Sequence, residues 1–251
     1  MASEVRIIGL QGVPDVTPGI DLAQVIVEAA QAQGFAFSSG DILIVTQKIV
    51  SKAEGQLVDL QTVTPSPFAL QVAKVQDKDP QVVEVVLRES RRVVRMAQRT
   101  IIAETHHGFV CAHAGVDESN VAGERTVALL PVDADASARR LREDIRQRTG
   151  VELAVIISDT FGRPWREGLV NVAIGVAGMD PMKDYRGLPD TEGRTLKVTT
   201  LAVADELASA AELVMGKLDR VPVAVIRGYA YTPGEGNSAR LLRAPERDLF
   251  R

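Results

Sequence analysis

The sequence predicts a fold in which helices and strands are mixed, of the α/β or α+β class. Short runs of branched apolar residues, of strand length, recur at 42–46, 154–157 and 221–226. Between such runs lie segments whose apolar residues recur at helical spacing. No internal repeat, low-complexity tract or long linker interrupts the 251 residues. Local patterns leave the order of the strands within the sheets open.

The N-terminal elements follow from these patterns in order. Residues 5–10 predict a first strand, and the Gly- and Pro-containing stretch 11–19 predicts a loop. Asp21 is expected to cap a helix that stops at Gly34. A second strand is expected at 42–46.

The middle of the chain carries similar signals. Asp79-Pro80 is a typical helix start, with Asp79 as the cap and Pro80 in the first helical position. Ser137 is expected to cap another helix, which Gly150 ends. A buried strand follows at 154–157.

The C-terminal third predicts strands at 169–176, 196–201 and 221–226, and a helix at 203–215 with Gly216 just past its end. Glycines in the following loop, 227–238, permit close backbone approach to a ligand. The loop lacks the Lys-Ser/Thr of a phosphate-binding loop, so it indicates a nucleotide only weakly.

Composition excludes several classes of protein. A hydrophobic content of 45% is ample for one large or two small domains. The net charge of −4 argues against a general nucleic-acid binder. Cys111 is the only cysteine, so no intrachain disulfide can form. Without a signal peptide or a run of transmembrane length, we expect a soluble cytoplasmic protein with no membrane partner.

The strongest chemical signal is Ser158-Asp159-Thr160, which follows the apolar run 154–157. We expect this triplet at the carboxyl end of a buried strand, where ligands often bind in sheets with helical connections. Asp159 and Thr160 offer the oxygen atoms that hold Mg²⁺ or Mn²⁺ against phosphates. The plain alternative is a strand end followed by a helix cap.

A second polar loop holds Asp117, Glu118 and Asn120. Such a loop can give a carboxylate to a divalent ion and an amide to a ligand. An Asx-type turn explains the same residues equally well.

Positively charged residues provide two further candidate sites for binding an anion such as phosphate. Lys52 lies between an apolar segment and Gly55, where an ammonium can meet phosphate oxygens, although a solvated lysine on a strand edge is the simpler interpretation. The loop 182–187 carries two cations and an acid and suits either an anionic substrate or an ordinary polar loop.

The strand-like stretch 105–113 also contains possible zinc ligands. His107, Phe109, Cys111 and His113 would share one strand face there. The closed four-ligand spacing of a structural zinc site is absent, and the period of a strand explains the pattern as well.

Several separated segments together resemble one family. The central segment reads I-S-D-T-F-G-R, and another reads A-G-V-D-E-S-N. In the family's order along nearly the whole chain, the matching segments are 12–14, 40–41, 51–55, 114–120, 157–163, 182–184, 203–206 and 223–228. The sequence is similar to the γ-glutamyl ligases of the deazaflavin coenzyme F420, in their stand-alone form.

The resemblance implies a GTP-dependent amide ligase that adds one or more L-glutamates to F420-0, with γ-linkage after the first. It implies an α+β fold peculiar to the family, with mixed sheets and packed helices, in an intertwined homodimer. It also implies two divalent ions (Mg²⁺ or Mn²⁺) and potassium. We expect residues 1–251 to form one such unit, which allows two subdomains without a clear boundary.

Site residues carry over by motif. Asp117 and Asp159 resemble the catalytic ligands of one metal ion, and Thr160 resembles a ligand of the second. The residues that resemble GTP contacts are Val13, Pro14, Asp15, Val16, Gln47, Lys52 and Asn120.

Two positions depart from the family pattern. Gln47 stands where a small hydroxyl residue is common, and Lys217, after Gly216, stands where some members have an acidic metal ligand. The second metal is therefore in question, and Gly216 and Lys217 are expected to contact phosphate instead. Glu118 and Asp184 are the candidates for the general base.

Two other kinds of protein fit the same residues. A metal-dependent phosphohydrolase would use the acidic pair with Thr160 and would turn over GTP without a glutamate acceptor. A non-catalytic nucleotide-binding module would use the acidic loops only as structural turns.

Overall fold

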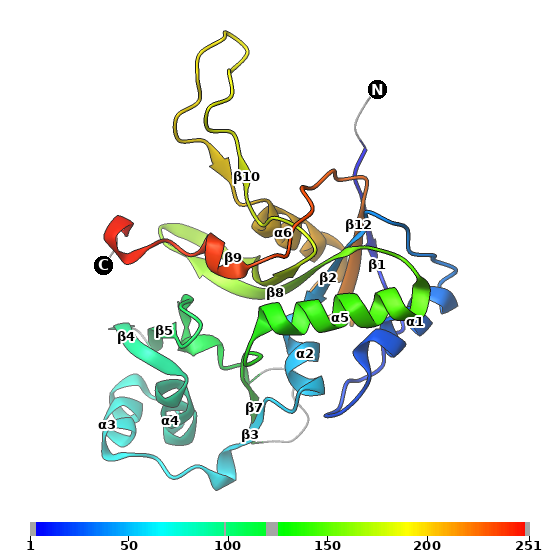
Figure 1. The fold of residues 1–251 in the computed structure, drawn as a ribbon. Helices are drawn as coiled ribbons and strands as arrows, with labels where there is room; N and C mark the ends of the chain where they lie inside the picture. Colours follow the sequence, from blue (N-terminus) through cyan, green and yellow to red (C-terminus); the bar gives the residue numbers. More distant parts are fainter. Residues whose placement is uncertain (1–3, 98, 119–124, 249–251) are drawn as a thin grey trace.

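A computed structural model describes residues 4–97, 99–118 and 125–248 of the chain (Figure 1). Its centre is a five-stranded sheet in which β2 and β8 pair in parallel and all other neighbours are antiparallel. Across the sheet, the strands are β1 (Arg6–Gly9), β12 (Val223–Arg227), β2 (Ile42–Thr46), β8 (Ala154–Arg163) and β9 (Arg166–Ala177). The α+β class, with mixed sheets and packed helices, is confirmed.

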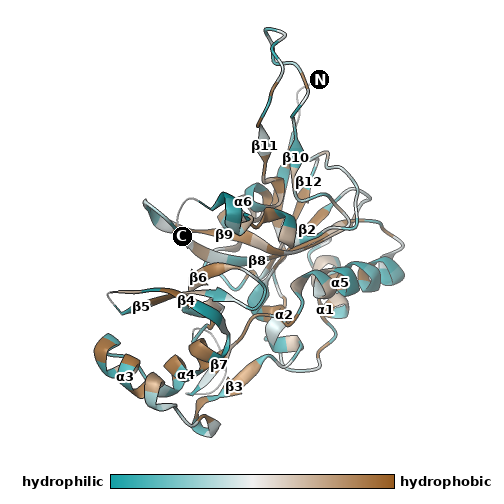
Figure 2. Ribbon diagram, turned by 60° about the vertical axis from the view of Figure 1, so that its left-hand side comes forward, coloured by the Kyte–Doolittle hydropathy of each residue, from teal (hydrophilic) through white to brown (hydrophobic). Residues whose placement is uncertain are grey.

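Helices cover both faces of this sheet. Helices α1 (Leu22–Ala32), α2 (Gln47–Ala53) and α5 (Ala134–Thr149) pack on one face, and α6 (Val203–Met215) packs on the other. Alternate side chains of each strand enter the two cores, as the period of two requires. Burial on both faces explains the continuous apolar runs in the sequence. In Figure 2, β2 and β12 are hydrophobic, whereas most of α5 is hydrophilic, as expected for a helix with one buried face.

Apolar side chains of the described residues between Val58 and Leu129 build a separate hydrophobic cluster beside the main sheet. Its centre is a helical pair, α3 and α4, packed on a small antiparallel sheet. The elements are β3 (Leu57–Asp59), α3 (Pro67–Gln76), α4 (Pro80–Arg88), β4 (Ser90–Ala97), β5 (Thr100–Thr105), β6 (Val110–Ala112) and β7 (Thr126–Ala128). This cluster brings the segment 112–117 against the edge of the main sheet.

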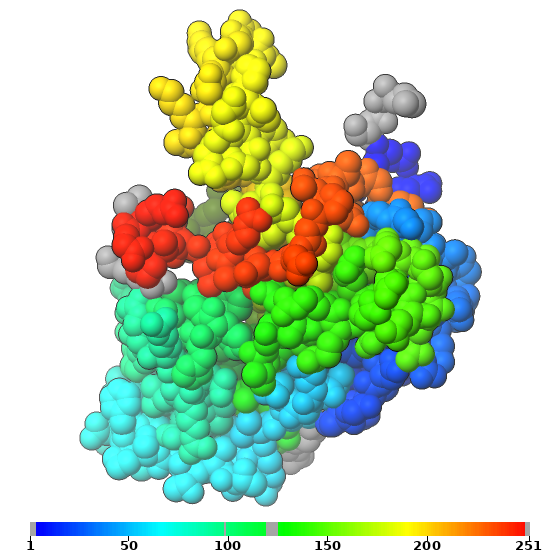
Figure 3. All heavy atoms as spheres, viewed as in Figure 1, coloured from blue at the N-terminus to red at the C-terminus, as the bar shows by residue number. Residues whose placement is uncertain are grey.

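A narrow arm projects from the body between β9 and α6 (Figures 1 and 3). At its base, β10 (Lys183–Asp184) pairs with β11 (Thr200–Leu201). The strand predicted at 196–201 is therefore wrong except for its last two residues. Beyond that pair the two halves of the arm stay joined by single backbone hydrogen bonds, such as Gly187 to Leu196 and Asp190 to Arg194, which do not form a regular ladder.

Three of the helices, α1, α4 and α5, begin after an aspartate whose side chain caps the first turn. Asp21 accepts a hydrogen bond from the Gln24 amide, and Asp79 accepts from Gln81, as predicted. The prediction that Ser137 caps α5 is wrong, because Asp133 accepts from the Ala136 amide and starts the helix earlier. Within the described parts of the chain, no helix combines the length and apolar character needed to cross a bilayer.

Candidate functional site

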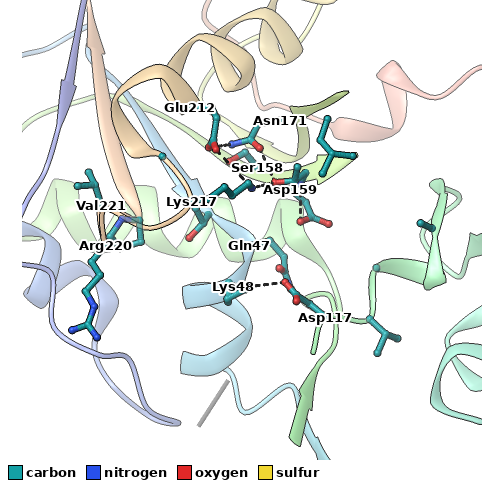
Figure 4. A pocket seen from close by; sticks show the side chains of 18 residues that line it. Gln47, Lys48, Asp117, Ser158, Asp159, Asn171, Glu212, Lys217, Arg220 and Val221 are labelled. Carbon is teal, nitrogen blue, oxygen red and sulfur yellow. Dashed lines mark hydrogen bonds and ion pairs between the residues drawn. The ribbon is translucent and has the colours of Figure 1, made fainter. Parts of the chain in front are cut away.

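A cavity of about 400 Å³ opens where the parallel pairing of β2 and β8 ends (Figure 4). Five parts of the chain line it: the junction of β2 with α2, the segment 112–117, both strands of the β8–β9 hairpin, the last turn of α6, and residues 216–222. The charged and polar residues among them are Thr46, Gln47, Lys48, Asp117, Ser158, Asp159, Thr160, Asn171, Glu212, Lys217 and Arg220.

The predicted triplet lies inside a strand, not at its end. Parallel pairing stops at Thr46 and Ser158, but β8 continues to Arg163 because its other edge still pairs with β9. Beyond Ser158, the edge of β8 that β2 leaves uncovered faces the cavity. The expectation that the triplet follows the carboxyl end of its strand is therefore wrong, and it is β2 that ends at the cavity.

Asp117 reaches this cavity from the other hydrophobic cluster. Its backbone exchanges hydrogen bonds of 2.9 and 3.0 Å with Ala128, which fixes the segment after β6 beside β7. Its carboxylate lies 2.8 Å from the ammonium of Lys48, in the first turn of α2. Asp117 and Asp159, 42 positions apart in the sequence, thus line one cavity, as the resemblance implies.

Burial, together with a smaller contribution from the negative charge of Asp117, raises the pKa of Asp159 to about 6. The backbone N–H of Thr160 and the ammonium groups of Lys217 and Lys48 oppose this rise. Loss of hydration is thus the main cause, ahead of the repulsion between the carboxylates. A cation between the two acids would favour their charged forms.

Thr160 belongs to a hydrogen-bonded chain on the opposite wall. Its hydroxyl donates to Asn171 Oδ1 at 2.8 Å and accepts from Lys217 Nζ at 2.5 Å. Asn171 Nδ2 donates to Glu212 Oε2 at 2.8 Å. Lys217 Nζ lies 3.7 Å from Glu212 Oε1. Figure 4 shows Asn171, Glu212 and Lys217 converging on this wall.

Sequence reasoning missed Lys48, Asn171, Glu212 and Arg220. One of them had a usable signal: Asn171 is a polar residue within the otherwise apolar run 169–176. In the structure it is buried at 2% exposure, with its amide paired on both sides. Glu212 and Lys48 lie in amphipathic helices, where a charged residue is ordinarily a solvated one.

The expected nucleotide contacts divide into two groups around α2. Gln47 is buried at the cavity, where its amide donates to Ser51 Oγ and to the Leu129 carbonyl. Lys52 and residues 13–16 do not line this cavity. Lys52 lies toward the opposite end of α2. There Gly19, in the loop that also contains residues 13–16, donates its amide to the Ala53 carbonyl. Asn120 lies outside the described residues.

The strand-edge interpretation of Lys52 is wrong, because residues 47–53 form helix α2. The apolar residues Ile49 and Val50 are buried on the helical face that packs on the sheet, so their run resembled a strand.

The donor set fits one divalent ion better than two. Asp117 and Asp159 offer carboxylate oxygens, and the buried hydroxyl of Ser158 has no hydrogen-bond partner among the described residues. No group of three or more His, Cys, Asp or Glu side chains is arranged around a metal position in the described ranges. This also leaves the stretch 105–113 without support for zinc.

Neither Asp184 nor Glu118, the two residues expected as the general base, is placed to accept a proton in the cavity. Arg186 pairs with Asp184 on the exposed arm and holds the pKa of Asp184 at about 2, which makes it a poor proton acceptor. Glu118 is exposed next to Asp117 and does not line the cavity.

Similarity to known proteins extends over nearly the whole chain. The family described as F420-0:Gamma-glutamyl ligase matches residues 12–228. A protein named Coenzyme F420:L-glutamate ligase from Methanothermobacter thermautotrophicus is 48% identical over 250 residues, covering 98% of this chain and 99% of its own. Proteins of the same name from Methanopyrus kandleri and Methanocaldococcus jannaschii are 48% and 42% identical, covering 94% and 99% of this chain and 93% and 97% of their own. The chain therefore belongs to the F420-0:γ-glutamyl ligase family.

Proposed function

We propose that this protein is a GTP-dependent ligase that joins L-glutamate to F420-0 through an amide bond. The observation that carries the proposal is the single cavity shared by Asp117 and Asp159, with Lys48, Lys217 and Arg220 around them. Family membership over residues 12–228 supplies the substrate class. A site that combines carboxylates with several cations suits a reaction between anionic substrates.

The chemistry requires two successive transfers. The carboxylate of F420-0 attacks the γ-phosphorus of GTP, which gives an acyl phosphate and releases GDP. The amine of L-glutamate then attacks the acyl carbon, an amide forms, and phosphate leaves as the amine loses a proton. Both reactants of the first step are anions, so Lys48, Lys217 and Arg220 offset their repulsion.

Asp117 and Asp159 would hold one Mg²⁺ or Mn²⁺ ion in this proposal. Such an ion neutralises the β- and γ-phosphate charge and orients the phosphoryl group. The second ion that the resemblance implies would need Thr160, whose hydroxyl already contacts Asn171 and Lys217. The proposal also includes potassium, to which we assign no ligand residues.

The geometry of α2 supports a position for the nucleotide. Gln47 and Lys48 lie at the cavity, and Lys52 lies at the opposite end of the helix, beside the loop that contains residues 13–16. We therefore place the triphosphate in the cavity and the nucleoside toward that loop.

A homodimer belongs to the same proposal. The arm extends away from the body and carries Leu188 at 51% and Val198 at 84% exposure. Apolar side chains on a narrow projection gain stability when a second copy covers them. One functional unit per chain, residues 1–251, is part of this arrangement.

Mass spectrometry of the deazaflavin tests the proposed function. Purified protein is incubated with GTP, Mn²⁺, L-glutamate and F420-0, and omission of L-glutamate is the control. We expect a mass gain of one or more glutamyl units only in the complete mixture. Phosphate release without that gain would favour a phosphohydrolase, and no turnover would favour a non-catalytic module.

A further inference from the structure

The environment of Thr160 differs from that of the Asp117–Asp159 pair in its balance of charge. The pair has two carboxylates and one ammonium, that of Lys48 beside Asp117, whereas the Thr160 wall has one carboxylate, Glu212, and one ammonium. Lys217 Nζ lies 2.5 Å from Thr160 Oγ1 and 3.7 Å from Glu212 Oε1. The ammonium therefore contacts both oxygen-bearing side chains that a metal ion at this wall would need.

A divalent ion has little room to join it. Mg²⁺ binds oxygen at about 2.1 Å, so an ion on Thr160 Oγ1 would lie within about 4 Å of the ammonium, against direct repulsion. The Thr160 proton is directed to Asn171, and Asn171 in turn donates to Glu212 Oε2. This chain of hydrogen bonds holds Thr160 and Glu212 in the orientation that Lys217 meets.

The balance of charge in the cavity also favours a single divalent ion. Its lining carboxylates are Asp117, Asp159 and Glu212, and its lining cations are Lys48, Lys217 and Arg220. Lys48 pairs with Asp117, and Lys217 lies beside Glu212. The remaining cation, Arg220, forms no ion pair with Asp159 in the described part of the chain, so the charge of Asp159 is left for an added cation to balance.

We infer that the ammonium of Lys217 takes the place of a second divalent ion, so that each subunit binds one Mg²⁺ or Mn²⁺, at Asp117 and Asp159. This inference rests on the proposed function, since the charge serves the triphosphate. Lys217 is suited to the role because it follows the helix end at Gly216, and its side chain is 60% exposed. The ammonium can therefore contact an arriving phosphate while it stays beside Thr160 and Glu212.

Counting bound Mn²⁺ tests the inference without measuring activity. The protein is saturated with a non-hydrolysable GTP analogue, and free Mn²⁺ is followed by electron paramagnetic resonance. We expect one ion per subunit in the unchanged protein and two in Lys217→Glu, where three acceptor side chains surround the vacated position. Lys217→Gln, which removes only the charge, should also bind more than one, whereas Lys217→Arg should bind one.

Lys74→Glu is the matched control, because it makes the same charge reversal at an exposed lysine of α3, outside the cavity. It should leave the count at one, and thermal melting confirms that each variant is folded. Two ions in the unchanged protein, or one ion in both Lys217→Glu and Lys217→Gln, would overturn the inference. Failure of the proposed function is seen separately, as an unchanged protein that transfers no glutamate.

Discussion

Asp117 and Asp159 are the residues on which the ligase proposal depends most directly. Asn keeps the shape of Asp and removes its charge, so Asp117→Asn and Asp159→Asn should each lower kcat/KM more than about a hundredfold, or about 2.7 kcal/mol. Because both serve one ion, the double variant should be little worse than either single one. Rates of glutamyl transfer test this, with the exposed Asp144→Asn as control. Losses that multiply would contradict the shared ion.

The environment of Asp159 also predicts an effect of pH on stability. The folded-state pKa of about 6 exceeds the unfolded value of about 3.9. The proton is therefore held more tightly in the folded protein, and its contribution to stability, complete below about pH 4, is lost as the pH rises through 6.

Asp159→Asn should accordingly stabilise the metal-free protein by about 1–2 kcal/mol at about pH 7.5 and hardly at all near pH 4. The gain is smaller than the whole pKa shift would give, because the side chain keeps some contact with solvent. Urea unfolding with a chelator at both pH values measures it. An equal gain at both would assign the effect to something other than ionisation.

At this scale, motif residues were predictable and their partners were not. Asp117, Asp159, Thr160, Gly216 and Lys217 do line one cavity. Their partners Lys48 and Glu212 come from other elements, and only tertiary packing brings them there. The grouping of residues 13–16 with Lys52, away from the cavity, likewise depends on how a loop meets the end of α2.

Among the elements, α2 carries the nucleotide proposal. Lys52 lies five residues after Gln47, so it is about 7.5 Å along the helix axis from the cavity end. A phosphate- or ribose-contacting ammonium contributes about 1.5–3 kcal/mol, so Lys52→Ala should weaken GTP binding roughly ten- to a hundredfold. Calorimetry of GTP binding measures this, with Lys74→Ala in the last turn of α3 as control. Unchanged affinity would make Lys52 a solvated residue of α2.

The central sheet is held at one end by a buried ion pair between β2 and β12. Both carboxylate oxygens of Asp41 lie 2.7 Å from the Arg227 guanidinium, and Arg227 also stacks on Phe35. The Asp41 side chain is 1% exposed and that of Arg227 is 35% exposed.

Removing the charge of Arg227 and removing that of Asp41 should therefore lower the free energy of unfolding by different amounts. Arg227→Ala leaves a buried carboxylate without its cation and should cost about 3–5 kcal/mol of unfolding free energy. Asp41→Asn leaves an arginine that can regain water, so its cost should be smaller. Urea unfolding of both variants compares them, and a larger loss for Asp41→Asn would reverse this assignment.

The ends of helices that carry a capping aspartate or a terminal glycine could be predicted from the sequence. The ends of strands that depend on pairing with another strand could not. The caps at Asp21 and Asp79 and the glycine stop at Gly150 depend on the residues themselves. The extension of β8 through Asp159 depends on pairing with β9. The segment 196–201 is a strand only at Thr200–Leu201, because its other backbone bonds to the facing half of the arm do not form a regular ladder.

For the whole molecule, we expect a dimer at micromolar concentration. If the arm packs against a second copy, Leu188→Asp with Val198→Asp should shift the protein to monomers, because two charges would be buried at the contact. Light scattering measures the mass, and Val75→Asp, at an equally exposed site on α3, is the control. An unchanged protein that is monomeric would contradict the proposed assembly.

The order of strands in the central sheet has a consequence for synthesis on the ribosome. β12, near the end of the chain, inserts between β1 and β2, which are formed from the first 46 residues. The early strands therefore wait for almost the whole polypeptide, and the high contact order predicts slow folding. Until β12 emerges, the apolar edges of β1 and β2 are exposed to aggregation, and a nascent chain of this kind depends on protection by chaperones.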